Sequence, residues 1–183
     1  MIKQLGFVFH ADRCIGCKSC ELACRNEHYA QGGLQFRRIT KLEDGSFLSF
    51  SCNHCDSPEC FRVCHNRAFT KRKDGVVRIN PHLCDGCREC IKVCPYGAPQ
   101  YDSNKNKVDK CDLCLPRIQK GLLPACVAAC HTGALEFADL DQLKLVGLQK
   151  QIKGFPDIRL TRPSIRFMPV STRKRYWQNK NTK

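Results

Sequence analysis

The chain has 183 residues, a formal net charge of +14 and 16 cysteines. This length allows one or two compact domains, and no stretch approaches the roughly 18 consecutive apolar residues that cross a bilayer. The composition therefore excludes a direct membrane span, and the density of cysteine indicates a framework made either of disulfides or of metal ions.

The secondary structure that the sequence predicts is short throughout. The apolar residues of 5–9 predict a strand that leads into the first cysteines, and this run is too short for a signal peptide, so we expect none. Further strands are predicted over residues 47–50, 76–79 and 135–137. Helices are predicted over residues 21–28, 89–93 and 139–151. Together these elements indicate small α+β modules.

The cysteines form four groups of four, and every group ends in C-x3-C. The groups are, in chain order, Cys14, Cys17, Cys20 and Cys24; Cys52, Cys55, Cys60 and Cys64; Cys84, Cys87, Cys90 and Cys94; and Cys111, Cys114, Cys126 and Cys130. The first and third share the spacing C-x2-C-x2-C-x3-C, and Pro95 follows the third. This is the pattern of bacterial two-cluster ferredoxins, in which three cysteines hold one cluster and the fourth holds another. The spacing therefore predicts iron–sulfur clusters.

Other cofactor chemistries fit the sequence less well. All-cysteine zinc sites draw on two separated C-x2-C pairs rather than on cysteine triplets. Covalent haem requires C-x2-C-H, whereas His65 and His131 follow C-x3-C. The chain contains neither G-x4-G-K-[ST] nor G-x-G-x-x-G, so no nucleotide site is predicted. Because full thiolate ligation leaves iron no open position for a substrate, we expect an electron carrier without catalytic residues.

Three histidines lie next to the cysteines, namely His54, His65 and His131. A histidine that donates a hydrogen bond to cluster sulfur raises the reduction potential. The alternative is a partly exposed side chain without such a role, and the sequence leaves both interpretations open.

The formal charge counts every cysteine as neutral, which overstates the basic excess. An oxidised cubane with its four thiolates carries a charge of about −2, so four of them would lower the net charge of the protein to about +6. Nucleic acid is therefore not an expected partner. Residues 150–183 hold ten lysines or arginines and one acid, which predicts an irregular extension with a flexible basic tail. Alternatives are an arm for nucleic acid or anionic lipid, or a docking strap with Tyr176 and Trp177.

Five stretches carry a more specific pattern. They are residues 13–24 (RCIGCKSCELAC), 51–55 (SCNHC), 94–101 (CPYGAPQY), 110–114 (KCDLC) and 161–165 (TRPSI). Together they resemble the four-cluster iron–sulfur subunits of molybdopterin oxidoreductases, most closely the dimethyl sulfoxide reductase type. Since all sixteen ligand positions of that pattern are cysteine here, we predict four [4Fe–4S] clusters.

Spacing alone does not decide which group exchanges its fourth cysteine with which, because neighbouring and nested pairs both satisfy the count. The resemblance implies nested pairs. Its ligand sets are Cys14, Cys17, Cys20 with Cys130; Cys111, Cys114, Cys126 with Cys24; Cys52, Cys55, Cys60 with Cys94; and Cys84, Cys87, Cys90 with Cys64. It also implies an α+β fold of two nested ferredoxin-like 2[4Fe–4S] modules with a C-terminal extension. The outer module would comprise residues 1–50 plus 100–138, the inner one 51–99, and a C-terminal helix and basic extension 139–183.

The same resemblance implies the partners and the place of the chain in the cell. The expected partners are a catalytic subunit with a molybdenum or tungsten bis-pterin cofactor and a membrane anchor that exchanges electrons with quinol, as in anaerobic respiration. The chain would lie peripherally at the cytoplasmic membrane through these partners, on a side that the sequence does not fix. Alternatives are an electron-transfer subunit of a hydrogenase or formate dehydrogenase complex, and a free polyferredoxin.

Overall fold

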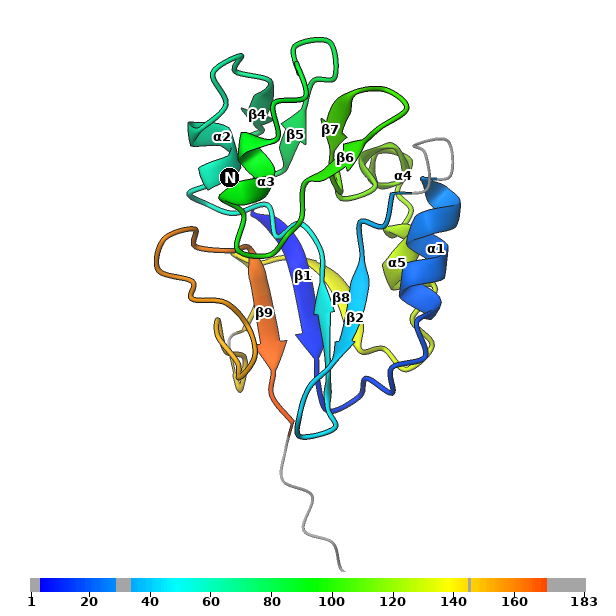
Figure 1. Cartoon of the computed structure of the whole chain (residues 1–183). Coiled ribbons are helices and arrows are strands. Elements are labelled where there is room, and N and C mark those ends of the chain that lie inside the picture. Colours follow the sequence, from blue (N-terminus) through cyan, green and yellow to red (C-terminus); the bar gives the residue numbers. More distant parts are fainter. Residues whose placement is uncertain (1–3, 29–33, 145, 171–183) are drawn as a thin grey trace, which may run out of the picture.

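The computed structural model describes residues 4–28, 34–144 and 146–170. Its main feature is a three-stranded sheet that pairs a strand near the start of this part of the chain with a strand near its end. The strands are β1 (Leu5–His10), β8 (Leu135–Asp139) and β9 (Ile165–Met168), in the order β8-β1-β9. β1 runs antiparallel to β8 and parallel to β9. Figure 1 shows β1 in the middle of this sheet, with β9 at its side. The strand expected from residues 5–9 is therefore confirmed, as the central strand.

Three antiparallel hairpins accompany the sheet. They are β2 (Arg38–Lys41) with β3 (Phe47–Phe50), β4 (Phe69–Lys71) with β5 (Val77–Ile79), and β6 (Gln100–Asp102) with β7 (Lys107–Asp109). Each hairpin turns at a short polar segment, and Gly45 and Gly75 supply the positive φ that two of these turns require. The strands expected over 47–50, 76–79 and 135–137 correspond to β3, β5 and β8.

The helices are short, and most of them carry cysteines. They are α1 (Ser19–Glu27), α2 (Glu59–Arg62), α3 (Glu89–Lys92), α4 (Leu115–Gln119) and α5 (Ala125–Ala128). In Figure 1, α1 and α5 lie side by side, and α2 and α3 lie together beyond the end of the sheet. The helices expected over 21–28 and 89–93 are confirmed as α1 and α3, and the α+β class is confirmed with them.

The helix expected over residues 139–151 is wrong. β8 ends at Asp139, and the residues described after it form turns. The backbone there serves the sheet: Leu140 donates its N–H to the Gln4 carbonyl at 2.8 Å, and Gln149 exchanges two backbone hydrogen bonds with Phe167. Gly147, at φ 74°, turns the backbone between these two points. Gln149 thus pairs with β9, an edge strand of the sheet, whereas Val146 is 85% exposed and covers no strand.

The C-terminal extension is less irregular than expected, because it contributes β9. The basic tail beyond Val170, with Tyr176 and Trp177, lies outside the described residues.

Two separate clusters of buried side chains make up the core. The larger one packs around the sheet and includes Phe7, Phe9, Phe36, Leu48 and Phe167. The smaller one lies between hairpins β4–β5 and β6–β7 and is built from Ala68, Phe69, Val77 and Val108. Cysteines belong to both clusters. The apolar interior is therefore small, and much of it surrounds sulfur.

Candidate metal centre

The first and third cysteine groups begin on loops with the same backbone bend. Gly16 and Lys18 have φ of 71° and 61°, and Gly86 and Arg88, at the same places in the third group, have φ of 78° and 66°. Glycine adopts this left-handed conformation without steric cost. The matching spacing in the sequence thus folds into matching loops, as an internal repeat requires.

A helix then separates the third cysteine of the first group from the fourth. Cys20 and Cys24 both lie on α1, four positions apart, and both are buried. One helical turn of about 3.6 residues returns the backbone to the same face but about 5.4 Å further along the axis. The fourth cysteine is thereby carried away from the loop that holds the first three.

Two cavities are each bordered by four cysteines. The first is bordered by Cys14, Cys17, Cys20 and Cys130, which we call set A. The second is bordered by Cys52, Cys55, Cys60 and Cys94, which we call set C. Apolar side chains complete the walls, among them Phe9 and Leu135 in set A and Val77 and Pro99 in set C. In both cavities three cysteines of one group meet the last cysteine of another.

The remaining eight cysteines lie in two further groups, because α1 with Cys24 packs against α5 with Cys126, and α2, which ends two residues before Cys64, packs against α3 with Cys90. Set B comprises Cys24, Cys111, Cys114 and Cys126. Burial raises the pKa of Cys24 to about 12, and the thiolate charges of Cys126 and Cys114 add to the effect. Set D comprises Cys64, Cys84, Cys87 and Cys90. Burial raises the pKa of Cys90 to about 12, and the charges of the other three members of set D add to it.

The four sets follow one another in a row. α1, with Cys20 and Cys24, packs against α5, with Cys126, which places set A beside set B. Lys110, at the wall of the set C cavity, directly precedes Cys111 of set B, and α2, with Cys60, packs against α3, with Cys90. The order is therefore A, B, C, D. At the outer ends, Cys17 of set A and Cys87 of set D are exposed.

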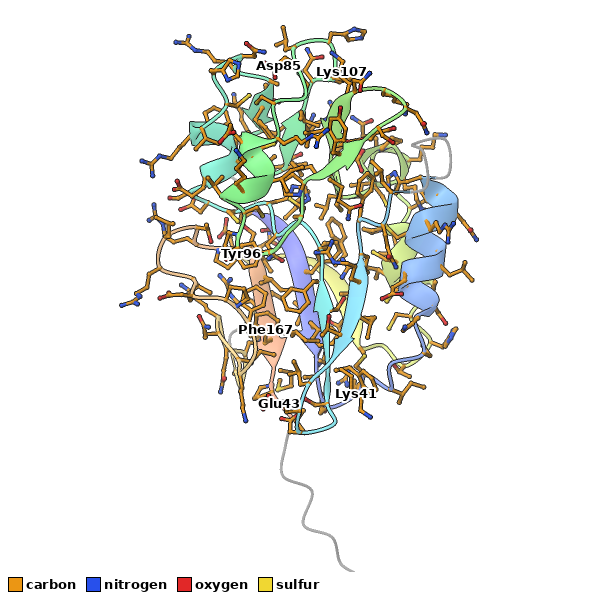
Figure 2. The ribbon with its side chains drawn as sticks, in the orientation of Figure 1. Lys41, Glu43, Asp85, Tyr96, Lys107 and Phe167 are labelled. Atoms are coloured by element: carbon orange, nitrogen blue, oxygen red, sulfur yellow. The ribbon has the colours of Figure 1, made fainter. Side chains whose placement is uncertain are left out.

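Sets A and D, the two outer sets of the row, lie toward opposite ends of the molecule. Gly16, in the loop of set A, packs against the ring of Phe47, which belongs to the hairpin that carries Lys41 and Glu43. Figure 2 shows Lys41 and Glu43 at one end, and Asp85, between Cys84 and Cys87 of set D, at the other. The row therefore extends along the length of the molecule.

Two described histidines have positions that suit a contact with cluster sulfur. One is His28, which the sequence did not single out and whose Nε2 lies 3.7 Å from the Sγ of Cys114 in set B; the other is His54. The ring of His54 lies at the wall of the set C cavity, is 1% exposed, and accepts a hydrogen bond at Nδ1 from the Val77 N–H at 3.1 Å. Burial, aided by the nearby Lys110 charge, lowers the pKa of His54 well below its ordinary value. The ring is therefore neutral with its proton on Nε2, a buried donor without a partner among the described residues.

His65 and His131 are exposed and have other partners. The Nε2 atom of His65 lies 2.9 Å from a carboxylate oxygen of Asp85, and that of His131 lies 3.0 Å from the Ser19 hydroxyl. Neither contact is to a cysteine. The sequence does not distinguish these two histidines from His54, because the difference lies in burial.

Two buried cations were not singled out from the sequence. Lys110 is 2% exposed, borders the set C cavity and donates hydrogen bonds from Nζ to the carbonyls of Val77 and Cys111. Burial works to lower the pKa of Lys110, but the thiolates around it outweigh burial and raise it. Arg37, 1% exposed, lies among cysteines of sets A and B. The place of Lys110 directly before Cys111 is a signal in the sequence, whereas Arg37 has none.

These residues fit [4Fe–4S] clusters. Each set offers four thiols in a small, largely apolar environment, which is the donor set that a cubane requires. Buried N–H donors without a partner among the described residues, on His54 and Arg37, lie beside the sets. Groups of that kind are almost always paired in folded proteins, so they indicate an acceptor that belongs to the cofactor.

Known families match the same cysteine-rich regions. Residues 43–140 match the model of a 4Fe-4S dicluster domain, and residues 11–27 match that of a 4Fe-4S binding domain. The chain is 40% identical to the B subunit of the anaerobic dimethyl sulfoxide reductase of Haemophilus influenzae, over 92% of this chain and 90% of the relative. It is 36% identical to the B subunit of the polysulfide reductase of Wolinella succinogenes, over 87% and 88%. It is 32% identical to the formate dehydrogenase iron-sulfur subunit of the same organism, over 84% and 91%.

The fold and the cysteine sets define an iron–sulfur protein of the ferredoxin type, with four [4Fe–4S] clusters. The sequence identity with the relatives, over most of the length of both chains, identifies the family. This protein belongs to the family of iron–sulfur electron-transfer subunits that includes the B subunits of anaerobic dimethyl sulfoxide reductases. Within the part of the chain that the structure describes, none of the helices has the length and apolar character needed to cross a bilayer.

Proposed function

We propose that this chain relays electrons between a quinol-linked membrane anchor, or another donor, and a molybdopterin catalytic subunit of the dimethyl sulfoxide reductase type. The observation that carries the proposal is the row of sets A to D, which is exposed at Cys17 and at Cys87. A relay needs closely spaced carriers and an entry and an exit that partners can approach. The row supplies both.

We propose that the ligands are the four sets themselves. Set A would hold one cluster through Cys14, Cys17, Cys20 and Cys130, set B one through Cys24, Cys111, Cys114 and Cys126, set C one through Cys52, Cys55, Cys60 and Cys94, and set D one through Cys64, Cys84, Cys87 and Cys90. The support for this assignment is the meeting of these thiols in four places, together with the sets implied by the resemblance.

The chain would serve electron transfer and no other chemistry. Bound [4Fe–4S] clusters supply one-electron transfer. Four thiolates on each would leave no open coordination position, which supports a subunit without catalytic residues. The side chains of this protein would hold the thiolates in place, exclude water with apolar walls such as Phe9, Leu135 and Val77, and set potentials through buried N–H groups.

The nested arrangement of modules is also part of the proposal. Sets A and B draw only on residues 1–50 and 100–138, and sets C and D only on 51–99, which supports an outer and an inner module with these bounds. Hairpin β6–β7 spans the division, because Val108 belongs to the smaller core and donates its N–H to the sulfur of Cys84 at 3.4 Å.

The partners follow from the relatives. The B subunits of dimethyl sulfoxide and polysulfide reductases among them support a catalytic subunit with a molybdenum or tungsten bis-pterin cofactor and a membrane anchor. The chain would then lie peripherally at the cytoplasmic membrane. The formate dehydrogenase iron-sulfur subunit among the relatives favours a second candidate, a relay in a formate dehydrogenase complex.

The test is to purify the protein anaerobically from its native cells, at native abundance, together with whatever it binds. We expect molybdenum or tungsten in the complex, about sixteen iron atoms per copy of this subunit in addition to the iron of its partners, and bleaching of the cluster absorbance by a reduced quinol analogue. Formate-dependent bleaching would favour the second candidate. A free monomer, or a hydrogen-activating centre in the complex, would contradict both.

A further inference from the structure

Arg37 is a charged side chain in an apolar part of the core. It directly precedes β2, is 1% exposed, and lies with its guanidinium carbon 4.4 Å from the centroid of the Phe7 ring. One of its nitrogens, Nη1, donates a hydrogen bond to the Ser49 hydroxyl at 2.7 Å. The other donors, Nε and Nη2, are buried and have no partner among the described residues.

A buried guanidinium with one neutral partner is costly. Removal of a charge from water costs several kcal/mol unless opposite charge and hydrogen bonds compensate, and an arginine does not lose its proton in a protein. The compensation available to Arg37 is sulfur. Thiolates of Cys20 in set A, and of Cys24, Cys111 and Cys126 in set B, all favour its charged form and raise its pKa, against the effect of burial.

Arg37 therefore lies beside both sets. Ser49, which accepts its hydrogen bond, lines the set A cavity, and the cysteines of set B lie near enough for their charges to act on the guanidinium. The charge of Arg37 also acts in the other direction, because it lowers the pKa of Cys20 and of Cys24 against the stronger effect of burial. Cys20 and Cys24 lie one turn apart on α1, and their thiols belong to different sets. One side chain thus serves two neighbouring ligand sets.

We propose that Arg37 is a positioning residue that gives the clusters of sets A and B a fixed positive charge and two N–H donors to sulfur, and so raises both reduction potentials. This inference rests on the ligand sets proposed above. Reduction adds a negative charge to a cluster, and a buried cation and N–H···S hydrogen bonds stabilise the reduced form. The clusters of sets C and D lie further along the row and would not share this effect.

The test is a potentiometric titration, followed by electron paramagnetic resonance, of the complex purified anaerobically with the variant Arg37→Gln. We expect the midpoint potentials of two of the four clusters to fall, by about 59 mV for each tenfold change in the one-electron equilibrium, while the other two stay within error. Iron per chain, measured on the same sample, reports separately on the proposed ligand sets.

The matched control is Lys41→Gln. Lys41 lies on β2, the strand that follows Arg37, carries the same charge, and is exposed. We expect four unchanged potentials in that variant. Unchanged potentials in Arg37→Gln with full iron, or an equal shift of all four, would overturn the inference while leaving the proposed function intact.

If Arg37→Gln loses iron, Arg37→Lys decides the question. Lysine retains the charge with a different shape. A role for the charge predicts two results. Arg37→Lys keeps full iron, and its potentials for the clusters of sets A and B lie closer to wild type than those of the holoprotein that Arg37→Gln still forms. Iron loss in both variants would assign Arg37 to packing and overturn the inference.

Discussion

At the scale of single residues, the cysteine sets are surrounded by polar groups whose hydrogen bonds are only partly made within the described residues. His54 is held in one tautomer by the Val77 N–H and keeps a free donor at Nε2 there. The Nζ atom of Lys110 donates hydrogen bonds to the backbone carbonyls of Val77 and Cys111. These residues act through the ligands that they adjoin, so substitutions there separate tuning from ligation.

The first prediction concerns His54. In His54→Leu the buried donor beside set C is lost, and the reduced form of that cluster loses a hydrogen bond to sulfur. We expect the midpoint potential of one cluster to fall by up to about 59 mV, a tenfold change in equilibrium, with iron per chain unchanged. His65→Leu, an exposed histidine paired with Asp85, is the control and should leave that potential alone. A titration in which His54→Leu matches wild type would refute the tuning role.

The second prediction concerns Lys110. In Lys110→Met two buried carbonyls lose their donor and the cysteines around it lose their counter-charge. Loss of one partner of a buried ionic contact costs about 3 kcal/mol or more. We expect an anaerobic denaturant titration of the holoprotein, followed by cluster absorbance, to show a clearly lower midpoint. Lys41→Met, at an exposed position on β2, should not move it. Equal midpoints for the two variants would mean that Lys110 contributes no such contact.

At the scale of elements, the sequence predicts what is local and misses what is distant. The helices α1 and α3, the strands β1, β3, β5 and β8, and the cysteine loops could all be predicted, because spacing, turn residues and short apolar runs determine them. The parallel pairing of β9 with β1 could not, since its partner lies about 160 positions away in the sequence. Phe167 of β9 also exchanges two backbone hydrogen bonds with Gln149, and these take the place of the helical hydrogen bonds expected there over 139–151.

The candidate site shows the same limit. Spacing alone identifies sixteen cysteines and iron–sulfur chemistry, but leaves nested and neighbouring exchange equally possible. The resemblance implies the nested sets, and two cavities of the structure are bordered by the cysteines of sets A and C; the sets as ligands stay a prediction. Arg37 could not be predicted, because nothing in its local sequence shows that the chain folds it beside two ligand sets.

The third prediction compares two glycines with the same backbone conformation. Gly86 and Gly45 have φ of 78° and 80°, so alanine costs about 1–2 kcal/mol at either position. At Gly86 a Cβ would also lie 2.5 Å from the Asn106 carbonyl oxygen, whereas at Gly45 it meets nothing within 4 Å. We expect Gly86→Ala to distort the loop of set D and lose about four iron atoms per chain. Gly45→Ala should keep full iron. Full iron in both variants would show that the loop tolerates the displacement.

At the scale of the whole molecule, we expect metal binding and folding to be coupled. The larger core contains cysteines of sets A, B and C, and the smaller one cysteines of set D. Each proposed set joins at least two segments that are distant in the sequence, so the clusters would fasten the chain where apolar burial is limited. Burial raises the pKa of most of these thiols, so cluster assembly must displace protons from them.

The fourth prediction follows from this coupling. Removal of iron by a chelator under anaerobic, reducing conditions should unfold the chain, because the free energy of metal binding is largely folding free energy in small metal domains. Circular dichroism should show a loss of strand and helix signal in parallel with the loss of cluster absorbance. An iron-free chain that still unfolds cooperatively, at the midpoint of the holoprotein, would contradict the coupling.

The central claim is that sixteen thiolates hold four complete cubanes. Its most direct test is spin quantitation by electron paramagnetic resonance on the complex, freshly prepared without oxygen and then fully reduced. We expect no three-iron signal from this subunit in the oxidised sample and, in the reduced one, about four spins per copy of it in addition to those of its partners. A three-iron signal assigned to this subunit, or an integrated intensity near three spins for this subunit, would contradict it.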